Sequence, residues 1–134
     1  MKVSEIRTAV IYCDGGCRNN GSEGAKAYGS FAVVVNGEVQ RVERMDFPVH
    51  TNNQAEYLAL QSAINYIIAD DRRLRLAWKI RTDSQLVVNQ LAGRARVKAA
   101  GLKDLHHDVV MALSCYDITV EWTPREEVAS ILGH

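Results

Sequence analysis

This 134-residue chain has few prolines and cysteines, and neither positive nor negative charge is in excess. Only two prolines occur, and no Pro- or Ser-rich linker or internal repeat divides the sequence. Sixteen basic residues balance sixteen acidic ones, which excludes a protein that coats nucleic acid with a strongly basic surface. No apolar run approaches the roughly 20 residues that span a membrane, and no secretory signal is evident. We therefore expect one domain over residues 1–134, without membrane association.

The three cysteines, Cys13, Cys17 and Cys115, are an odd number and show no disulfide framework. Free thiols persist in reducing compartments, whereas small secreted domains pair their cysteines. We therefore expect a cytoplasmic protein. The spacing of Cys13 and Cys17 is a weak zinc signal, because no second pair of thiols accompanies them.

The first third of the chain has the signals of an antiparallel meander. Residues 7–14 and 27–35 are rich in β-branched and apolar side chains, and residues 38–45 alternate polar with apolar types. Asn36-Gly37 is typical of a two-residue hairpin turn, because both positions accept a positive φ. We predict three antiparallel strands here.

The hydrophobic period then changes from two to that of a helix. Apolar residues recur at three and four positions between residues 54 and 70, and Thr51 with Gln54 fits a capping box at the start of this helix. The element order predicts an α/β fold: a five-stranded mixed sheet, with three antiparallel and two parallel strands and helices on both faces. The other predicted elements are strands 78–82 and 118–122 and helices 84–92, 102–113 and 126–132.

Three carboxylates have both an ordinary structural explanation and a chemical one. Asp14 ends the first strand before two glycines, although Asp-Gly is also common in turns. Glu56 shares the apolar face of the long helix with Leu60, although a helix N-terminus also favours an acid. Asp83 follows the fourth strand, where it could equally cap the next helix.

The predicted sheet brings these three acids together. If the first and fourth strands are neighbours, Asp14 and Asp83 emerge side by side, and the long helix places Glu56 between them. Carboxylates this close raise each other's pKa unless a divalent cation compensates their charge. Oxygen ligands suit Mg²⁺ or Mn²⁺, and two such ions roughly 3.5–4 Å apart support phosphodiester hydrolysis. We therefore predict a two-metal site.

These acids lie in segments that together resemble the type 1 ribonuclease H family. Any one segment is a weak signal, but the order Asp, Glu, Asp, each in its own context, is specific. The resemblance implies the ribonuclease H-like fold and endonucleolytic cleavage of the RNA strand of RNA/DNA hybrids, leaving a 3′-hydroxyl and a 5′-phosphate. The segments are Tyr12-Cys13-Asp14-Gly15-Gly16-Cys17, Thr51-Asn52-Asn53-Gln54-Ala55-Glu56, Thr82-Asp83-Ser84 and Val120-Glu121-Trp122-Thr123-Pro124-Arg125-Glu126-Glu127.

The resemblance also implies roles for individual residues. The three acids would be catalytic carboxylates that bind two Mg²⁺ or Mn²⁺ ions with the substrate. Asn52 and Gln54 are suited to read the minor groove of the hybrid, because amides both donate and accept hydrogen bonds. Thr51 would meet a phosphate of the DNA strand. The implied substrate-binding residues are Cys17, Asn20, Thr51, Asn52 and Gln54.

The end of the chain departs from the family pattern. The family usually carries a fourth acid in an Ala-Asp pair, but the corresponding pair is Ala129-Ser130, and a serine is a poor Mg²⁺ ligand. His134, four residues after Ser130, and Glu126 or Glu127 are candidate replacements. We predict a three-acid core with an auxiliary group from the tail, the alternative being a solvated terminal histidine.

The main prediction is a metal-dependent hydrolase that acts on RNA/DNA hybrids, and we expect it to be a monomer. Two other functions remain open. The missing fourth acid would also fit a nucleic-acid-binding module that kept the fold and lost turnover. A different nuclease of the same fold, resembling a resolvase or an integrase, would act on plain or branched DNA.

If His134 supplies the auxiliary group, replacing it with alanine lowers the turnover number for hybrid cleavage. Steady-state assays of wild type and His134→Ala measure this directly. Unchanged kinetics would show that the His134 ring takes no part in catalysis.

Overall fold

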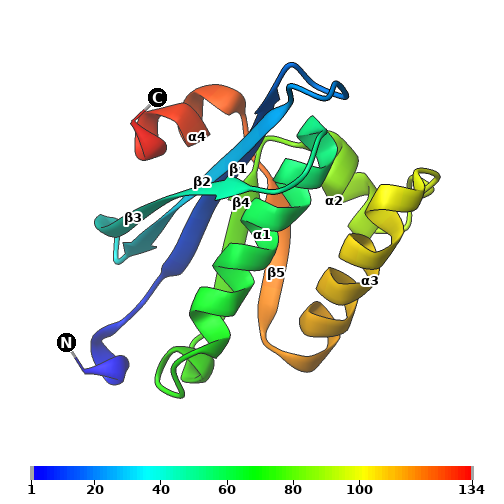
Figure 1. Ribbon diagram of the computed structural model, residues 1–134. Helices are drawn as coiled ribbons and strands as arrows, with labels where there is room; N and C mark the ends of the chain where they lie inside the picture. The colour runs from blue at the N-terminus through cyan, green and yellow to red at the C-terminus, as the bar shows by residue number, and fades with distance from the viewer. Residues whose placement is uncertain (1, 134) are drawn as a thin grey trace.

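A five-stranded mixed sheet with the strand order β3-β2-β1-β4-β5 lies at the centre of the structure (Figure 1). The computed structural model describes residues 2–133. β1 pairs with β2 and β2 with β3 in antiparallel register, while β4 lies parallel to both β1 and β5. This confirms the predicted strand neighbours. The strands are β1 (Ala9–Arg18), β2 (Lys26–Val35), β3 (Glu38–Phe47), β4 (Trp78–Thr82) and β5 (Ile118–Trp122).

Helices cover both faces of the sheet, as predicted (Figure 1). The long helix α1 packs across β1 and β2 with α3 beside it, and α4 lies against the opposite face of β1 and β2. Within residues 2–133, no helix combines the length and apolar character of a membrane span. The helices are α1 (Asn52–Ile68), α2 (Gln85–Leu91), α3 (Ala100–Cys115) and α4 (Arg125–Leu132), with short 3₁₀ helices at Val3–Glu5 and Arg73–Arg75.

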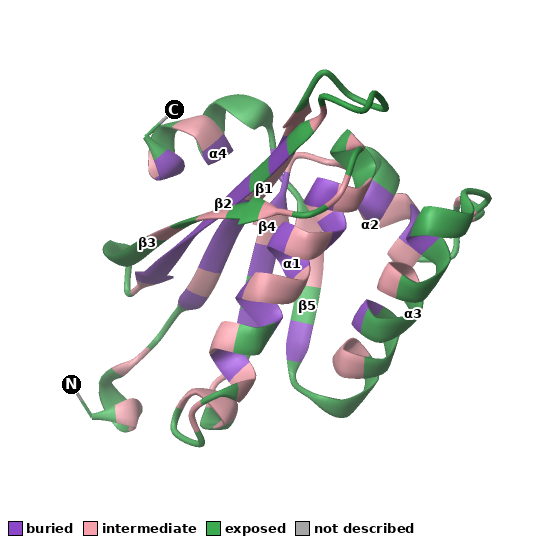
Figure 2. Cartoon of the chain, viewed as in Figure 1, coloured by how far each residue is buried: buried purple, intermediate pink, exposed green. Residues whose placement is uncertain are grey.

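Successive side chains of a strand point to opposite faces of the sheet, and helices cover both faces. The central strands are therefore buried on both sides. Ile11 of β1 joins the larger cluster beneath α1 and α3, whereas Tyr12 joins a smaller cluster with Val128 and Leu132 of α4. Figure 2 shows the buried colour concentrated on the central strands and on the side of α1 that faces them. This arrangement explains the nearly continuous apolar run at the start of the chain.

The β1–β2 hairpin extends further than the sequence predicts. The first strand was predicted to end at Asp14, before two glycines, but the ladder continues until Arg18 pairs with Lys26. The turn therefore occupies only residues 19–25. The expected end of the strand was wrong, because the glycines serve close packing rather than a change of chain direction.

Gly15 lies where the backbone of α1 packs closely on β1. A Cβ atom built at this glycine would lie 2.3 Å from the carbonyl oxygen of Ala55 and 2.6 Å from the amide nitrogen of Glu56. Both are backbone atoms, which cannot rotate away. A residue without a side chain is therefore required for α1 to hold its place on the sheet.

Replacing Gly15 with alanine should separate α1 from β1 and destabilise the fold by about 1–3 kcal/mol, the usual cost of overpacking. Urea denaturation of Gly15→Ala measures this loss. Gly24→Ala is the matched control, because its Cβ would meet nothing closer than 3.9 Å. Equal stability of the two variants would contradict the close approach.

Candidate active site

The sheet topology places two acids side by side just beyond the last residues that pair β1 with β4 in parallel. Tyr12 of β1 is in register with Arg81 of β4, and an aspartate follows each of them two residues later. Asp14 therefore lies beside Asp83. With Glu56 of α1 they form a cluster in which one carboxylate oxygen from each lies within 4.8 Å of the others. The structure thus brings the three predicted acids into one site.

Glu56 is held in this cluster by the sheet itself. The amide of Gly15 donates a hydrogen bond to Glu56 Oε1 at 2.7 Å, and Thr82 Oγ1 donates to Oε2 at 3.3 Å. Burial and the nearby charge of Asp14 raise the pKa of Glu56 to about 9, although the Gly15 hydrogen bond opposes the shift. Without a cation, this carboxyl retains its proton at neutral pH.

Asp83 does not cap the helix that it precedes. The N-cap of α2 is Ser84, whose Oγ accepts a hydrogen bond from the amide of Val87 at 3.2 Å. The side chain of Asp83 is only 9% exposed, and its Oδ2 lies 3.2 Å from Nε of Arg125. The capping role considered for Asp83 is therefore wrong, and its carboxylate is available to the cluster.

The acids open into a cleft of about 520 Å³ at this edge of the sheet. Its far wall comes from Arg125, Val128 and Ala129 of α4, and Tyr28 of β2 closes one side. Tyr28 and Arg125 were not among the predicted site residues. The position of Arg125 directly after Pro124, behind the last strand, was the available signal. The cleft is lined by Asp14, Gly15, Gly16, Tyr28, Asn52, Glu56, Asp83, Ser84, Arg125, Val128 and Ala129.

The donor set of the cluster fits divalent metal ions. Three carboxylates within 4.8 Å of one another disfavour each other's charge, and Asp14 adds to the burial that raises the pKa of Glu56. Hard oxygen ligands of this kind suit small divalent cations. Cys13 is buried beside the acids, and burial followed by the charge of Glu56 raises the pKa of its thiol. Asp14, Glu56 and Asp83 are the residues that would hold the metal.

The predicted substrate-binding residues form a continuous polar surface beside the cleft. The amide of Cys17 donates to Asn52 Oδ1 at 2.6 Å, and the amide of Asn52 donates to Asn20 Oδ1 at 2.7 Å. A neighbouring groove joins the start of α1 to the start of α3. Their roles stay predictions. The groove is lined by Asn20, Thr51, Asn52, Asn53, Gln54, Ala99, Gly101 and Leu102.

Two of these side chains already stabilise the start of α1. Thr51 and Gln54 form the predicted capping box. The backbone amide of Gln54 donates to Thr51 Oγ1, and the side-chain oxygen Oε1 of Gln54 accepts from the backbone amide of Thr51. The same oxygen also accepts from the amide of His50 at 3.1 Å. Only the side-chain nitrogen of Gln54 is therefore left to meet a ligand.

The candidate fourth ligands do not reach the cleft within the described residues. Glu126 and Ser130 are exposed, and neither belongs to the cleft lining. Glu127 accepts a hydrogen bond from Thr123 instead. His134 lies outside the described residues. The α4 side of the cluster therefore presents the cation of Arg125.

A cluster of acids from two adjacent strands of a mixed sheet and from the helix packed on them is the arrangement of a metal-dependent phosphoryl-transfer enzyme. Residues 7–126 match the sequence model of RNase H, so the chain belongs to the RNase H family. The predicted family and its nuclease activity are thereby confirmed.

Solved structures of RNase H proteins share the fold along almost the whole chain. LC11-RNase H1, in complex with an RNA/DNA hybrid, is 26% identical with a TM-score of 0.80, covering 92% of this chain and 91% of that one. RNase H1 of Halobacterium salinarum is 26% identical with a TM-score of 0.78 (91% and 89%). The N-terminal RNase H domain of a Mycobacterium tuberculosis protein is 28% identical with a TM-score of 0.77 (92% and 87%).

Glu56 should make the metal-free protein less stable as the pH rises. Folding raises its pKa from the usual 4.5 to about 9, so its favourable contribution is complete below about pH 4.5 and is lost as the pH approaches 9. Glu56→Gln removes this penalty. In EDTA, its Tm should exceed that of wild type by a few degrees at pH 8 and by less at pH 5.

Thermal denaturation across this pH range provides the measurement, with Glu126→Gln as an exposed control. A Tm difference between Glu56→Gln and wild type that does not change with pH would contradict the raised pKa.

Proposed function

We propose that this protein cleaves the RNA strand of RNA/DNA hybrids by hydrolysis that depends on Mg²⁺ or Mn²⁺. The convergence of Asp14, Glu56 and Asp83 carries the proposal, because a site of this charge needs cations and suits phosphodiester chemistry. The similarity to LC11-RNase H1, which was solved with such a hybrid, supports the substrate. The products implied are a 3′-hydroxyl and a 5′-phosphate.

The chain's own residues fix the geometry of the reaction. When bound, a pair of divalent ions activates water and compensates the charge on the leaving oxygen. Gly15 and Thr82 orient Glu56 through their hydrogen bonds, so its two oxygens face the cluster in a defined way. Arg125 places a positive charge at the rim of the cleft, where it can pair with a phosphate of the bound strand. No side chain is required as a general base.

One observation supports a second candidate, a binding module with little turnover. None of Glu126, Glu127 and Ser130 lines the cleft, so among these candidates no fourth carboxylate joins the cluster. Cleavage assays on a labelled hybrid in Mg²⁺ and in Mn²⁺ separate the two functions. Tight binding without cleavage in either metal would favour the module.

We also propose that the protein acts as a monomer in the reducing cytoplasm. All three acids come from one chain, so the site needs no partner subunit. The free thiols of Cys13, Cys17 and Cys115 suit a reducing compartment.

Asp14→Asn should reduce hybrid cleavage at least about 100-fold, because a neutral amide removes one charge from a cluster that must hold divalent ions. Initial rates on a labelled RNA/DNA hybrid in Mg²⁺ measure the effect. Asp71→Asn, at an exposed acid beyond the other end of α1, is the control and should retain the wild-type rate. Wild-type activity in Asp14→Asn would overturn the metal site.

A further inference from the structure

Beyond the acids, the β1–β2 ladder carries a row of side chains with no role in the function described above. Side chains of directly paired residues share one face of the sheet, and alternate residues along a strand share it too. The row lies on the face that carries α4, because Tyr12 and Ala32 in the same row pack against Val128. From the acidic cluster outwards, the pairs are Asp14 with Ser30, Gly16 with Tyr28, and Arg18 with Lys26.

The cleft follows this row away from the acids. Tyr28 lines the cleft together with Asp14, and this tyrosine is 42% exposed. Gly16 is buried beneath it, since a Cβ atom there would lie 2.5 Å from the Tyr28 hydroxyl oxygen. The absence of a side chain at Gly16 lets the phenol lie flat against β1. The ring thus forms a wall that leads from the acids towards the end of the hairpin.

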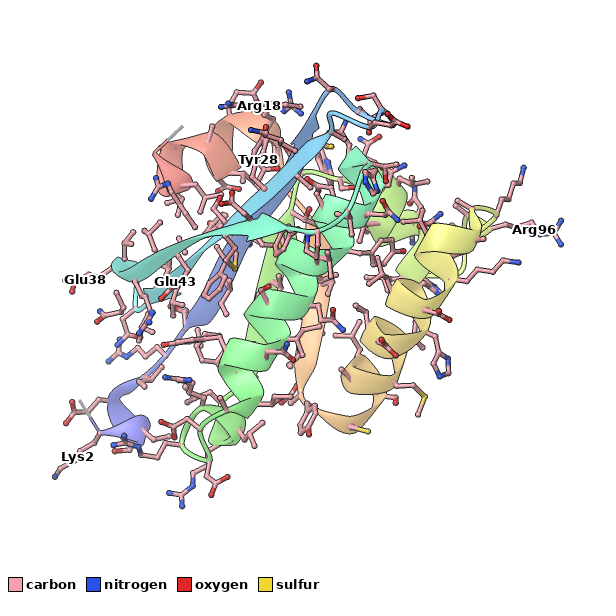
Figure 3. All side chains as sticks on the ribbon, in the orientation of Figure 1. Lys2, Arg18, Tyr28, Glu38, Glu43 and Arg96 are labelled. Carbon is pink, nitrogen blue, oxygen red and sulfur yellow. The ribbon has the colours of Figure 1, made fainter. Side chains whose placement is uncertain are left out.

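Two cations stand opposite each other where this row ends. Arg18 and Lys26 are exposed and directly paired, which brings their Cβ atoms to about 4.5–5.5 Å. Like charges in this position destabilise a hairpin. In the described part of the chain neither residue has an ion-pair partner, although the turn between them contains Glu23. Figure 3 shows Arg18 close to Tyr28, towards the end of the β1–β2 hairpin and near α4.

The separation along the strand suits an extended polyanion. Arg18 follows Asp14 by four residues, or about 14 Å at the usual rise of an antiparallel strand. A strand whose reacting phosphate lies at the acids and whose backbone runs past Tyr28 brings further phosphates to this cationic pair. These phosphates would relieve the repulsion between the two side chains.

We infer that Arg18, Lys26 and Tyr28 form a binding track for the RNA strand: the phosphodiester backbone of the cleaved strand passes over Tyr28, and the two cations pair with its phosphates. The track rests on the proposed function, because it continues from the acids that would hold the scissile phosphate. We favour the RNA strand over the DNA strand because the row of side chains begins at Asp14. Asp14 belongs to the acids that would hold the scissile phosphate, and that phosphate is part of the RNA.

The double variant Arg18→Ala/Lys26→Ala tests the track. We expect KM for hybrid cleavage to rise about tenfold with kcat nearly unchanged. Removing each cation that pairs with a phosphate should reduce the slope of log Kd against log salt by about one, measured without divalent ions. Arg7→Ala/Lys79→Ala is the matched control, because it removes one arginine and one lysine from exposed positions at the other end of the sheet.

Hybrids with neutral methylphosphonates near the cleavage site, placed in one strand at a time, identify the strand. Neutral linkages in the RNA should abolish the difference in affinity between wild type and the double variant. If neutral linkages in the DNA abolish it instead, the assignment to the RNA strand is overturned. Identical salt slopes and KM values for the two double variants would overturn the track altogether.

Tyr28→Ala provides an independent test, compared with Val39→Ala, whose side chain is similarly exposed on β3. We expect Tyr28→Ala to raise KM severalfold while Val39→Ala does not, with thermal denaturation confirming that both fold. Equal KM values would exclude the tyrosine from the track. Failure of the wild type to bind or cleave hybrid would overturn the proposed function as well, whereas cleavage with an unaltered salt slope would overturn the track alone.

Discussion

The close packing of α1 on β1 is the constraint on which the site depends. Gly15 lets the backbone of α1 lie against the strand, and the amide of the same residue then donates to Glu56. This packing carries a carboxylate into a place where burial and Asp14 both oppose its charge. The hydrophobic cluster beneath α1 supplies the compensating stability, because Leu60, Ile64 and Ile67 are almost wholly buried on the same helix. The fold therefore holds an unfavourable electrostatic arrangement in place for chemistry.

Much of the architecture follows from local patterns in the sequence. The Asn36-Gly37 turn, the capping box at Thr51 and the helical period of α1 each have a short-range cause, and all three are present in the structure. The length of the β1–β2 hairpin was not predictable in this way. Glycine at residues 15 and 16 favours a turn when only neighbours in the chain are considered. Its actual use depends on Ala55 and Tyr28, which are distant in sequence.

The same distinction applies to the site. The three acids could be proposed from their residue types and contexts, since each follows a recognisable element. Tyr28 could not, because a tyrosine near a strand start is an ordinary surface residue until the chain folds, and the position of Arg125 after Pro124 was only a weak signal. Their positions in the cleft follow from the packing of α4 against β1 and β2. The roles of Cys17, Asn20 and Asn52 in substrate binding stay predictions, although their mutual hydrogen bonds show that they form one surface.

Because Ser84 caps α2, the start of this helix places no demand on the carboxylate of Asp83. Structural and chemical duties at the end of β4 are divided between two adjacent residues. A substitution at Asp83 can therefore remove the chemistry while leaving the cap of α2 intact. Because the two duties belong to different residues, a single substitution can convert the enzyme into a protein that binds its former substrate without cleaving it. Evolution can make that change without losing the fold.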